Sequence, residues 1–224
     1  MTIRLDLEPL VRDAGTESTR DRILRVAAEK FAQKGYHATG VAELGDAAGI
    51  KRGALYYHIG SKEELLYHLC RRHVEEARSR GQTAIAGVTG AVEKFRLLVC
   101  EHLRTLAARR DEVVVVMHEM YALNGDLAKQ FTALRGEYEQ LFANVLREGV
   151  EEGVFRSAER IEVLGVLSML NYTYVWLDPH GPISVDDIAE RLTNLILFGA
   201  HVPLTGPPPP RAAPVGMGER SLTR

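Results

Sequence analysis

The chain has 224 residues, with 28 Lys and Arg against 30 Asp and Glu, so its formal net charge is −2. This length allows one or two compact domains with sizeable cores, and the near balance of charge excludes a polycation that binds nucleic acid by gross charge alone. The two cysteines, Cys70 and Cys100, are too few for a disulfide framework and lack the spacing of metal ligands. Because there is no signal peptide and no apolar run of about 18 residues, we expect a cytoplasmic protein without membrane contact.

The N-terminal part of the chain is more basic than the rest. Between Thr16 and Lys62, eight positive residues outnumber five negative ones, which leaves this segment at +3 and the remainder at −5. Residues 1–17 are expected to form a short flexible arm, in which Asp6 and Glu8 argue against insertion into a DNA minor groove. A basic end on an acidic body suits a protein that offers phosphates one face only, although solvated helices also carry mixed charge.

Residues 39–64 predict two short helices around a glycine turn. The first helix has Leu44 on its apolar side and stops at Gly49, a residue that can take the left-handed backbone of a tight turn. The second places Leu55 and Ile59 four residues apart, so this face packs inward and the remaining side chains point outward. Two such helices, the second with exposed aromatic and basic groups, form an arrangement that places a helix in the major groove of DNA.

Four short motifs follow one another across Thr19–Leu69. They are Phe31-Ala32-x-x-Gly35-Tyr36, Ala48-Gly49-Ile50, Gly53-x-Leu55-Tyr56-Tyr57-His58-Ile59 and Ser61-Lys62-Glu63. In this order and at this spacing they resemble the helix-turn-helix of TetR-type bacterial repressors. The last motif also predicts a helix start, with Ser61 as its cap and Glu64 at the capping-box position.

The resemblance implies an all-α fold with two domains. Residues 18–64 would form a three-helix, helix-turn-helix DNA-binding domain, and residues 65–201 a helical effector-binding and dimerisation domain. The expected partner is double-stranded DNA carrying a palindromic operator. Three positions depart from the family pattern, Gly40, Ala42 and Lys51, so we expect an operator different from those of relatives.

The helix that begins near Lys51 is expected to read the DNA. Arg52 is the first candidate for a base contact, because a guanidinium can bond guanine at two places, and Lys51 would serve a base or a phosphate. The small Gly53 and Ala54 would let the backbone approach the groove floor. The other expected contacts, mostly to phosphate or sugar, are Thr39, Tyr56, Tyr57, His58 and Lys62. For Tyr56 the alternative is packing against the inward face of its helix.

From residue 64 onward, apolar residues recur at helical spacing. The expected helices cover 64–80, 92–106, 112–123 and 126–152, with Gly81, Gly87 and Gly90 marking a break after the first of them.

The last two expected helices differ from these in their apolar faces. Residues 161–177 leave almost no polar face, which favours burial on both sides, against the core and against a partner subunit. Ser184 would cap a final helix over 184–200. By resemblance, these two helices make a homodimer as a four-helix bundle; the alternative is that 161–177 lies wholly inside its own domain. Residues 202–224, rich in proline, are expected to be disordered.

Four short segments of the body resemble a TetR subset that answers to acyl-CoA or steroid-derived CoA ligands. These segments are 111–116, 135–138, 153–156 and 176–181. They imply a small hydrophobic or acyl-CoA-type effector, although Asp178 stands where relatives carry a basic residue. The candidate pocket residues are Phe95, Met117, Met120, Tyr121, Phe131, Tyr138, Tyr172, Tyr174 and Trp176. A plain helical core would contain the same residue types.

Two other classes of function compete with a DNA-binding regulator. For an enzyme, His118-Glu119 begins like a zinc-protease motif, but the second histidine is missing because residue 122 is alanine. His68 and His73 lie roughly 140° apart around a helix, a poor shared metal site. We therefore expect no catalysis, cofactor or metal. The remaining alternative is a helical ligand-binding or scaffold protein without specific DNA binding, which salt-sensitive binding to a palindrome would exclude.

Overall fold

A computed structural model describes residues 17–199, apart from the side chain of Arg52, and within this range the fold is all-α, as predicted. The predicted arm and the predicted disordered tail lie outside the described residues, except for Glu17. The helices are α1 (Thr19–Lys34), α2 (Val41–Ala48), α3 (Arg52–Ile59), α4 (Lys62–Ile85), α5 (Ala91–Ala108), α6 (Arg110–Glu119), α7 (Gly125–Glu151), α8 (Arg160–Tyr172) and α9 (Val185–Phe198). Two single turns of 3-10 helix, η1 (Met120–Ala122) and η2 (Thr173–Val175), follow α6 and α8.

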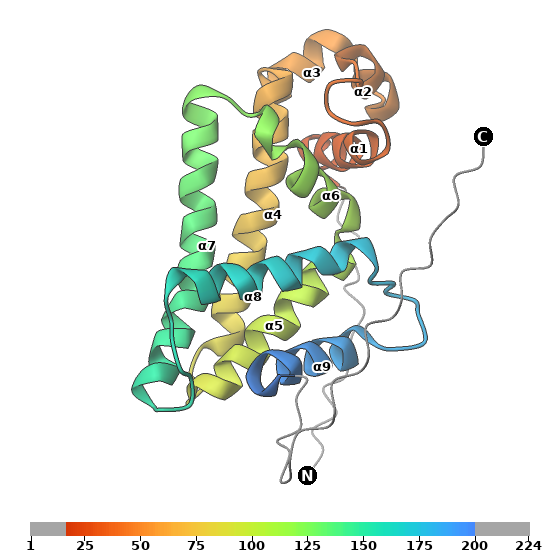
Figure 1. Ribbon diagram of the computed structural model, residues 1–224. Helices are drawn as coiled ribbons and strands as arrows, with labels where there is room; N and C mark the ends of the chain where they lie inside the picture. Colours follow the sequence, from red (N-terminus) through yellow and green to blue (C-terminus); the bar gives the residue numbers. More distant parts are fainter. Residues whose placement is uncertain (1–16, 200–224) are drawn as a thin grey trace, which may run out of the picture.

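The first three helices gather at one end of the molecule, around the start of α4 (Figure 1). The long α4 runs from there into the body, where it packs against α7 and α5, and α5 packs in turn against α9. Helix α6 contacts both α1 and α4. No helix within residues 17–199 combines the length and the apolar sequence needed to cross a membrane.

Two hydrophobic clusters hold these helices together. The first joins α1, α2 and α3 to the N-terminal half of α4, to α6 and to the start of α7, through residues such as Phe31, Leu55 and Val115. The second joins α5, the C-terminal half of α7, α8 and α9, with Phe95 and Phe142 at its centre. The predicted domain boundary after residue 64 thus falls inside α4, and the first cluster extends across it.

Gly81 does not break a helix, and this part of the prediction is wrong. Helix α4 continues through it to Ile85, and Gly81 is buried. A Cβ atom at this position would lie 2.9 Å from Leu141 Cδ2 and 3.1 Å from Leu98 Cδ2, so the glycine allows α7 and α5 to approach α4 closely. The break comes after α4, where Gly87 and Gly90 have φ of +74° and +87°.

Ser61 and Glu64 form the predicted capping box at the start of α4. The Ser61 hydroxyl accepts from the Glu64 backbone N–H at 3.0 Å, and the Glu64 carboxylate accepts from the Ser61 N–H at 2.9 Å. We expect Ser61→Ala to lower the free energy of unfolding by about 1 kcal/mol, because one N-terminal backbone N–H loses its acceptor. Urea unfolding measures this loss. Ser79→Ala, at an exposed position within α4, is the control, and an equal loss in both variants would contradict a capping role.

Candidate DNA interface and effector cavity

Helices α2 and α3 are joined by the predicted glycine turn. Gly49 adopts the left-handed conformation, with φ of +66° and ψ of +35°, and its N–H donates to the Asp46 carbonyl at 3.1 Å. The Ile50 N–H reaches back to the Gly45 carbonyl at 2.8 Å. These bonds satisfy carbonyls at the end of α2 and fix the direction in which the chain enters α3.

Helix α3 presents one buried face and one open face. Leu55 and Ile59 are fully buried, 0% and 4% exposed, as predicted from their spacing. Lys51, Gly53, Ala54 and both tyrosines of α3 lie exposed. Tyr57 is 87% exposed, whereas Tyr56 is only 38% exposed. A Cβ atom at Gly53 would meet nothing within 4 Å, so the backbone there is open to a close approach. The packing of α3 therefore leaves Ala54 and Tyr57, with Lys51 at its N-cap, exposed to solvent on one face.

Thr39 is not available to DNA, and its prediction as a phosphate contact is corrected. Its side chain is fully buried, and its hydroxyl donates to the Gly35 carbonyl at 2.9 Å, with the Lys30 carbonyl at 3.4 Å. No side chain caps the start of α2, where Gly40 is the N-cap. Thr39 instead satisfies carbonyls at the end of α1 and fixes the corner between the two helices.

Lys62, the first residue of α4, lies against the end of α1. Its ammonium nitrogen is 4.4 Å from the centre of the Tyr36 ring and 3.5 Å from the His37 carbonyl oxygen. Burial lowers the pKa of Lys62. Sequence reasoning used Tyr36 only as a family marker and missed this contact, which keeps the ammonium beside the N-terminus of α4.

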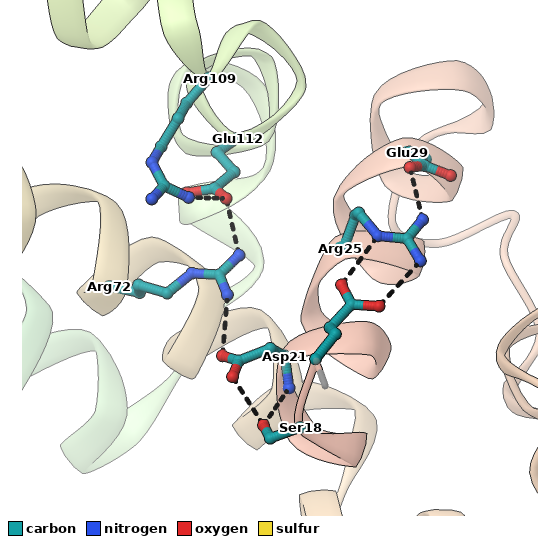
Figure 2. A network of polar contacts seen from close by, with 8 residues as sticks. Ser18, Asp21, Arg25, Glu29, Arg72, Arg109 and Glu112 are labelled. Atoms are coloured by element: carbon teal, nitrogen blue, oxygen red, sulfur yellow. Dashed lines mark hydrogen bonds and ion pairs between the residues drawn. The ribbon is translucent and has the colours of Figure 1, made fainter. Parts of the chain in front are cut away.

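A network of charged residues links α1, α4 and α6 (Figure 2). Glu112 is 7% exposed at the start of α6, and its Oε1 accepts from Arg72 Nη2 at 2.6 Å and from Arg109 Nη1 at 3.0 Å. Arg72 also lies 3.6 Å from Asp21 on α1, and Arg109 lies 2.7 Å from Glu76 on α4. No sequence pattern indicated this network, because the contacts that join its helices connect residues far apart along the chain. It ties the start of the first helix to the start of α6.

A cavity of about 110 Å³ lies between α4, α5, α6, η1, α7 and α8. Met117, Met120 and Tyr138, three of the predicted pocket residues, line it. Because α6 holds Glu112 at one end and Met117 near the other, a single short helix contacts both the charged network and the cavity.

The other predicted pocket residues do not line this cavity, and the prediction is corrected for them. Phe95 and Phe131 are buried within the two hydrophobic clusters. Tyr121, Tyr172 and Trp176 are exposed instead. Tyr174, also outside the lining, bonds His118 Nε2 through its hydroxyl at 2.7 Å. Residue type and helical spacing alone do not distinguish a side chain in the hydrophobic core from one on the surface or one that lines the cavity.

The cavity is also lined by two buried histidines, which the sequence did not indicate as pocket residues. His73 comes from α4 and His102 from α5, and each is 5% exposed. Burial lowers the pKa of His73 to about 4, and the charges of Arg109 and Arg72 act in the same direction. Burial also lowers the pKa of His102 to about 3. Both imidazoles are therefore neutral at pH 7. The sequence feature that could have indicated a buried role for His102 is its position among the apolar residues of one helix face.

Comparison with known proteins agrees with this architecture. The family model described as bacterial regulatory proteins, tetR family, matches residues 23–69, and that of the tetracyclin repressor-like C-terminal domain matches residues 88–200. The HTH-type transcriptional repressor KstR2 of Mycolicibacterium smegmatis is 29% identical over 186 residues, which cover 81% of this chain and 90% of KstR2.

Solved structures lead to the same family. The TetR family regulator PfmR from Thermus thermophilus is 35% identical and superposes with a TM-score of 0.75. The match covers 81% of this chain and 100% of PfmR. AibR, solved in complex with isovaleryl coenzyme A and operator DNA, is similar in fold, with 21% identity, a TM-score of 0.73, and coverage of 80% of this chain and 98% of AibR. With both family models matched in chain order, the chain belongs to the TetR family of DNA-binding bacterial transcriptional regulators.

Proposed function

We propose that this regulator is a cytoplasmic repressor, which binds a palindromic operator as a homodimer and leaves it when a small hydrophobic or acyl-CoA-type effector binds. The observation that carries the proposal is the open face of α3, held in place by the buried Leu55 and Ile59. KstR2, with similar sequence over most of its length, is named a transcriptional repressor, which supports this direction of regulation.

The proposed DNA contacts lie on α3 and at the start of α4. Arg52 and Lys51 stand at the N-terminal end of α3, the part of a recognition helix that contacts base edges. Gly53 and Ala54 would permit close approach to the groove. The proposed contacts to phosphate and sugar are Tyr56, Tyr57, His58 and Lys62, of which Lys62 adds an ammonium to the positive end of a helix.

The proposed dimer forms through α8, η2 and α9. These elements expose large apolar side chains, among them Ile161 at 69%, Tyr172 at 63%, Trp176 at 52% and Phe198 at 71%. Large apolar side chains left exposed on a monomer are candidates for a surface that another chain covers. A two-fold axis would place two α3 helices in successive major grooves, about 34–36 Å apart.

The proposed effector site is the cavity between α4 and α8. About half of its lining side chains are apolar, such as Leu106 and Val116, and the others are polar, so the cavity offers both kinds of contact to a ligand. The fold neighbour AibR is bound to isovaleryl coenzyme A, which supports an acyl-CoA as the class of effector. An effector there would act on DNA binding only by favouring one conformation over the other, and α6 is the element placed to respond.

Arg52 and Lys62 are expected to differ in how their loss changes DNA binding. Arg52→Ala should relax sequence preference at one base position, at a cost of about 1–3 kcal/mol, because a base contact is lost. Lys62→Ala should weaken binding to all sequences about equally and reduce the salt dependence by about one phosphate contact. Fluorescence anisotropy with operator and scrambled duplexes at several salt concentrations measures both. Parallel loss in the two variants would contradict these roles.

The proposed function as a whole is tested by selecting bound sequences from a random DNA pool at two salt concentrations. We expect an enriched palindrome whose binding weakens steeply as salt rises, because a dimer that neutralises several phosphates releases their counterions. No enrichment at either concentration would favour the alternative of a ligand-binding or scaffold protein without specific DNA binding.

A further inference from the structure

At one end of the cavity between α4 and α8, two histidine ring nitrogens are buried in the wall. His102 Nε2 and His73 Nδ1 are both buried, and within the described part of the chain neither makes a hydrogen bond of good geometry, although the Asn171 side chain acts on His102 as a neighbouring hydrogen-bonding group. Both residues line the cavity. Buried polar atoms are rarely left without a partner, because each costs free energy until one is supplied. Two such atoms in the wall of one cavity indicate a polar group of a ligand.

The contact of His102 with Tyr138 decides what this nitrogen offers. The Tyr138 hydroxyl lies 2.7 Å from His102 Nδ1, and burial raises the pKa of Tyr138, so the hydroxyl keeps its proton. Among the described residues, the acceptor for the Tyr138 hydroxyl proton is His102 Nδ1. A neutral imidazole that accepts at Nδ1 carries its own proton at Nε2. His102 therefore turns a donor, Nε2–H, toward its unpaired side, and the complementary ligand group is an oxygen acceptor.

The charges around the cavity favour an uncharged acceptor over a carboxylate. Both histidines are neutral: the hydrogen-bonding influence of the Asn171 side chain, which also lines the cavity, raises the pKa of His102, but burial lowers it more. Arg72 and Arg109 act on His73 from outside the lining, but Glu112 pairs with both. A carboxylate at the histidine end would be buried without a counter-ion, which is costly. A carbonyl oxygen accepts the same hydrogen bonds without that cost.

The size of the cavity limits what is attached to this oxygen. At about 110 Å³, the cavity is smaller than an engineered apolar cavity of about 150 Å³ that holds benzene. A short acyl chain fits such a volume, whereas a long fatty acyl chain or a fused ring system does not. Arg135 and Ser168, both exposed, line the outer part of the cavity, where the rest of a larger molecule would leave it.

We propose that the cavity binds the short acyl group of a thioester, whose carbonyl oxygen accepts a hydrogen bond from His102 Nε2–H beside His73. This inference rests on the proposed function, since it identifies the class of effector for that same site. It goes further in naming the histidines as the residues that select an uncharged carbonyl over a free carboxylate.

The test is isothermal titration calorimetry of the full chain, without DNA, with matched probes. Butyryl-CoA and its thioether analogue S-butyl-CoA have the same four-carbon chain and differ by the carbonyl oxygen. We expect butyryl-CoA to bind about tenfold more tightly, the contribution of one hydrogen bond to a neutral group. Butyrate, free CoA and palmitoyl-CoA should each bind at least tenfold more weakly than butyryl-CoA.

Substitutions locate the preference within the cavity. His102→Leu is combined with Tyr138→Phe, so that no buried hydroxyl loses its acceptor, and we expect this double variant to bind both four-carbon probes about equally. His180→Leu, in an exposed turn outside the lining, should keep the tenfold preference. The comparison of probes on the unsubstituted protein stands even where the double variant does not fold.

Four results would overturn the inference: equal binding of thioester and thioether by the unsubstituted protein, a preference that survives in the folded double variant, butyrate as tight as butyryl-CoA, or no binding of butyryl-CoA. Its failure is distinct from that of the proposed function. If butyryl-CoA binds as expected but never changes affinity for the selected operator, the site stands and the effector role does not.

Discussion

Glu112→Gln is expected to lower the free energy of unfolding by about 3 kcal/mol, because a neutral amide cannot balance two arginines that are partly removed from water. The Glu112 side chain is 9% exposed, and those of Arg72 and Arg109 are 25% and 33% exposed. Each arginine keeps a second acidic neighbour, Asp21 or Glu76, so the loss should fall at the low end for a broken buried pair. Urea unfolding measures it as a shift in midpoint at constant slope.

The matched control for this substitution is Glu75→Gln. Glu75 also pairs with an arginine, Arg71 at 2.8 Å, but on the surface of α4, where the side chains are 39% and 47% exposed. An exposed pair of this kind contributes about 0.5 kcal/mol or less. Equal losses in the two variants would mean that Glu112 is an ordinary surface ion pair, and that the network of Figure 2 does not hold α1, α4 and α6 together.

Leu55→Ala should cost about 3 kcal/mol of stability and abolish operator binding at concentrations that saturate the unsubstituted protein. Leu55 is fully buried beneath α3, so truncation leaves a cavity as well as losing apolar contact. With this anchor gone, α3 would no longer hold its exposed residues in one orientation. Urea unfolding gives the first quantity, and anisotropy with the selected operator gives the second.

Tyr57→Ala provides the opposite case on the same helix. At 87% exposed, Tyr57 contributes little to packing, so we expect stability to stay within about 0.5 kcal/mol while DNA affinity falls. A Tyr57→Ala variant with undiminished DNA binding would argue that the open face of α3 is not the DNA surface. Retention of operator binding by Leu55→Ala would argue that α3 does not need this anchor.

Local signals in the sequence predicted the DNA-binding end well. Gly49 was identified as a turn and Ser61 as a cap because both act on backbone groups within a few residues, and the structure confirms both. Leu55 and Ile59 followed from helical spacing. The DNA contacts themselves, from Lys51 to Lys62, remain predictions, because no partner in the structure tests them.

Features that depend on distant parts of the chain were harder to predict. Gly81 has the appearance of a helix breaker until Leu141, sixty residues further on, is known to lie against it. Phe95 and Met117 are equally plausible as pocket residues by type, and only the packing of α5 and α6 separates core from cavity. The same holds for His73 and His102, whose meeting at one cavity depends on how α4 lies against α5.

The hydrophobic cluster that extends from α1 to α7 has a consequence for attempts to divide this regulator. A fragment ending near residue 64 would leave Phe31 and Leu55 without Leu66 and Val115, their neighbours in that cluster. Such a fragment would expose apolar surface on every helix and self-associate rather than compete for operators. A DNA-binding fragment that folds on its own therefore needs α4, α6 and the start of α7 as well as the first three helices.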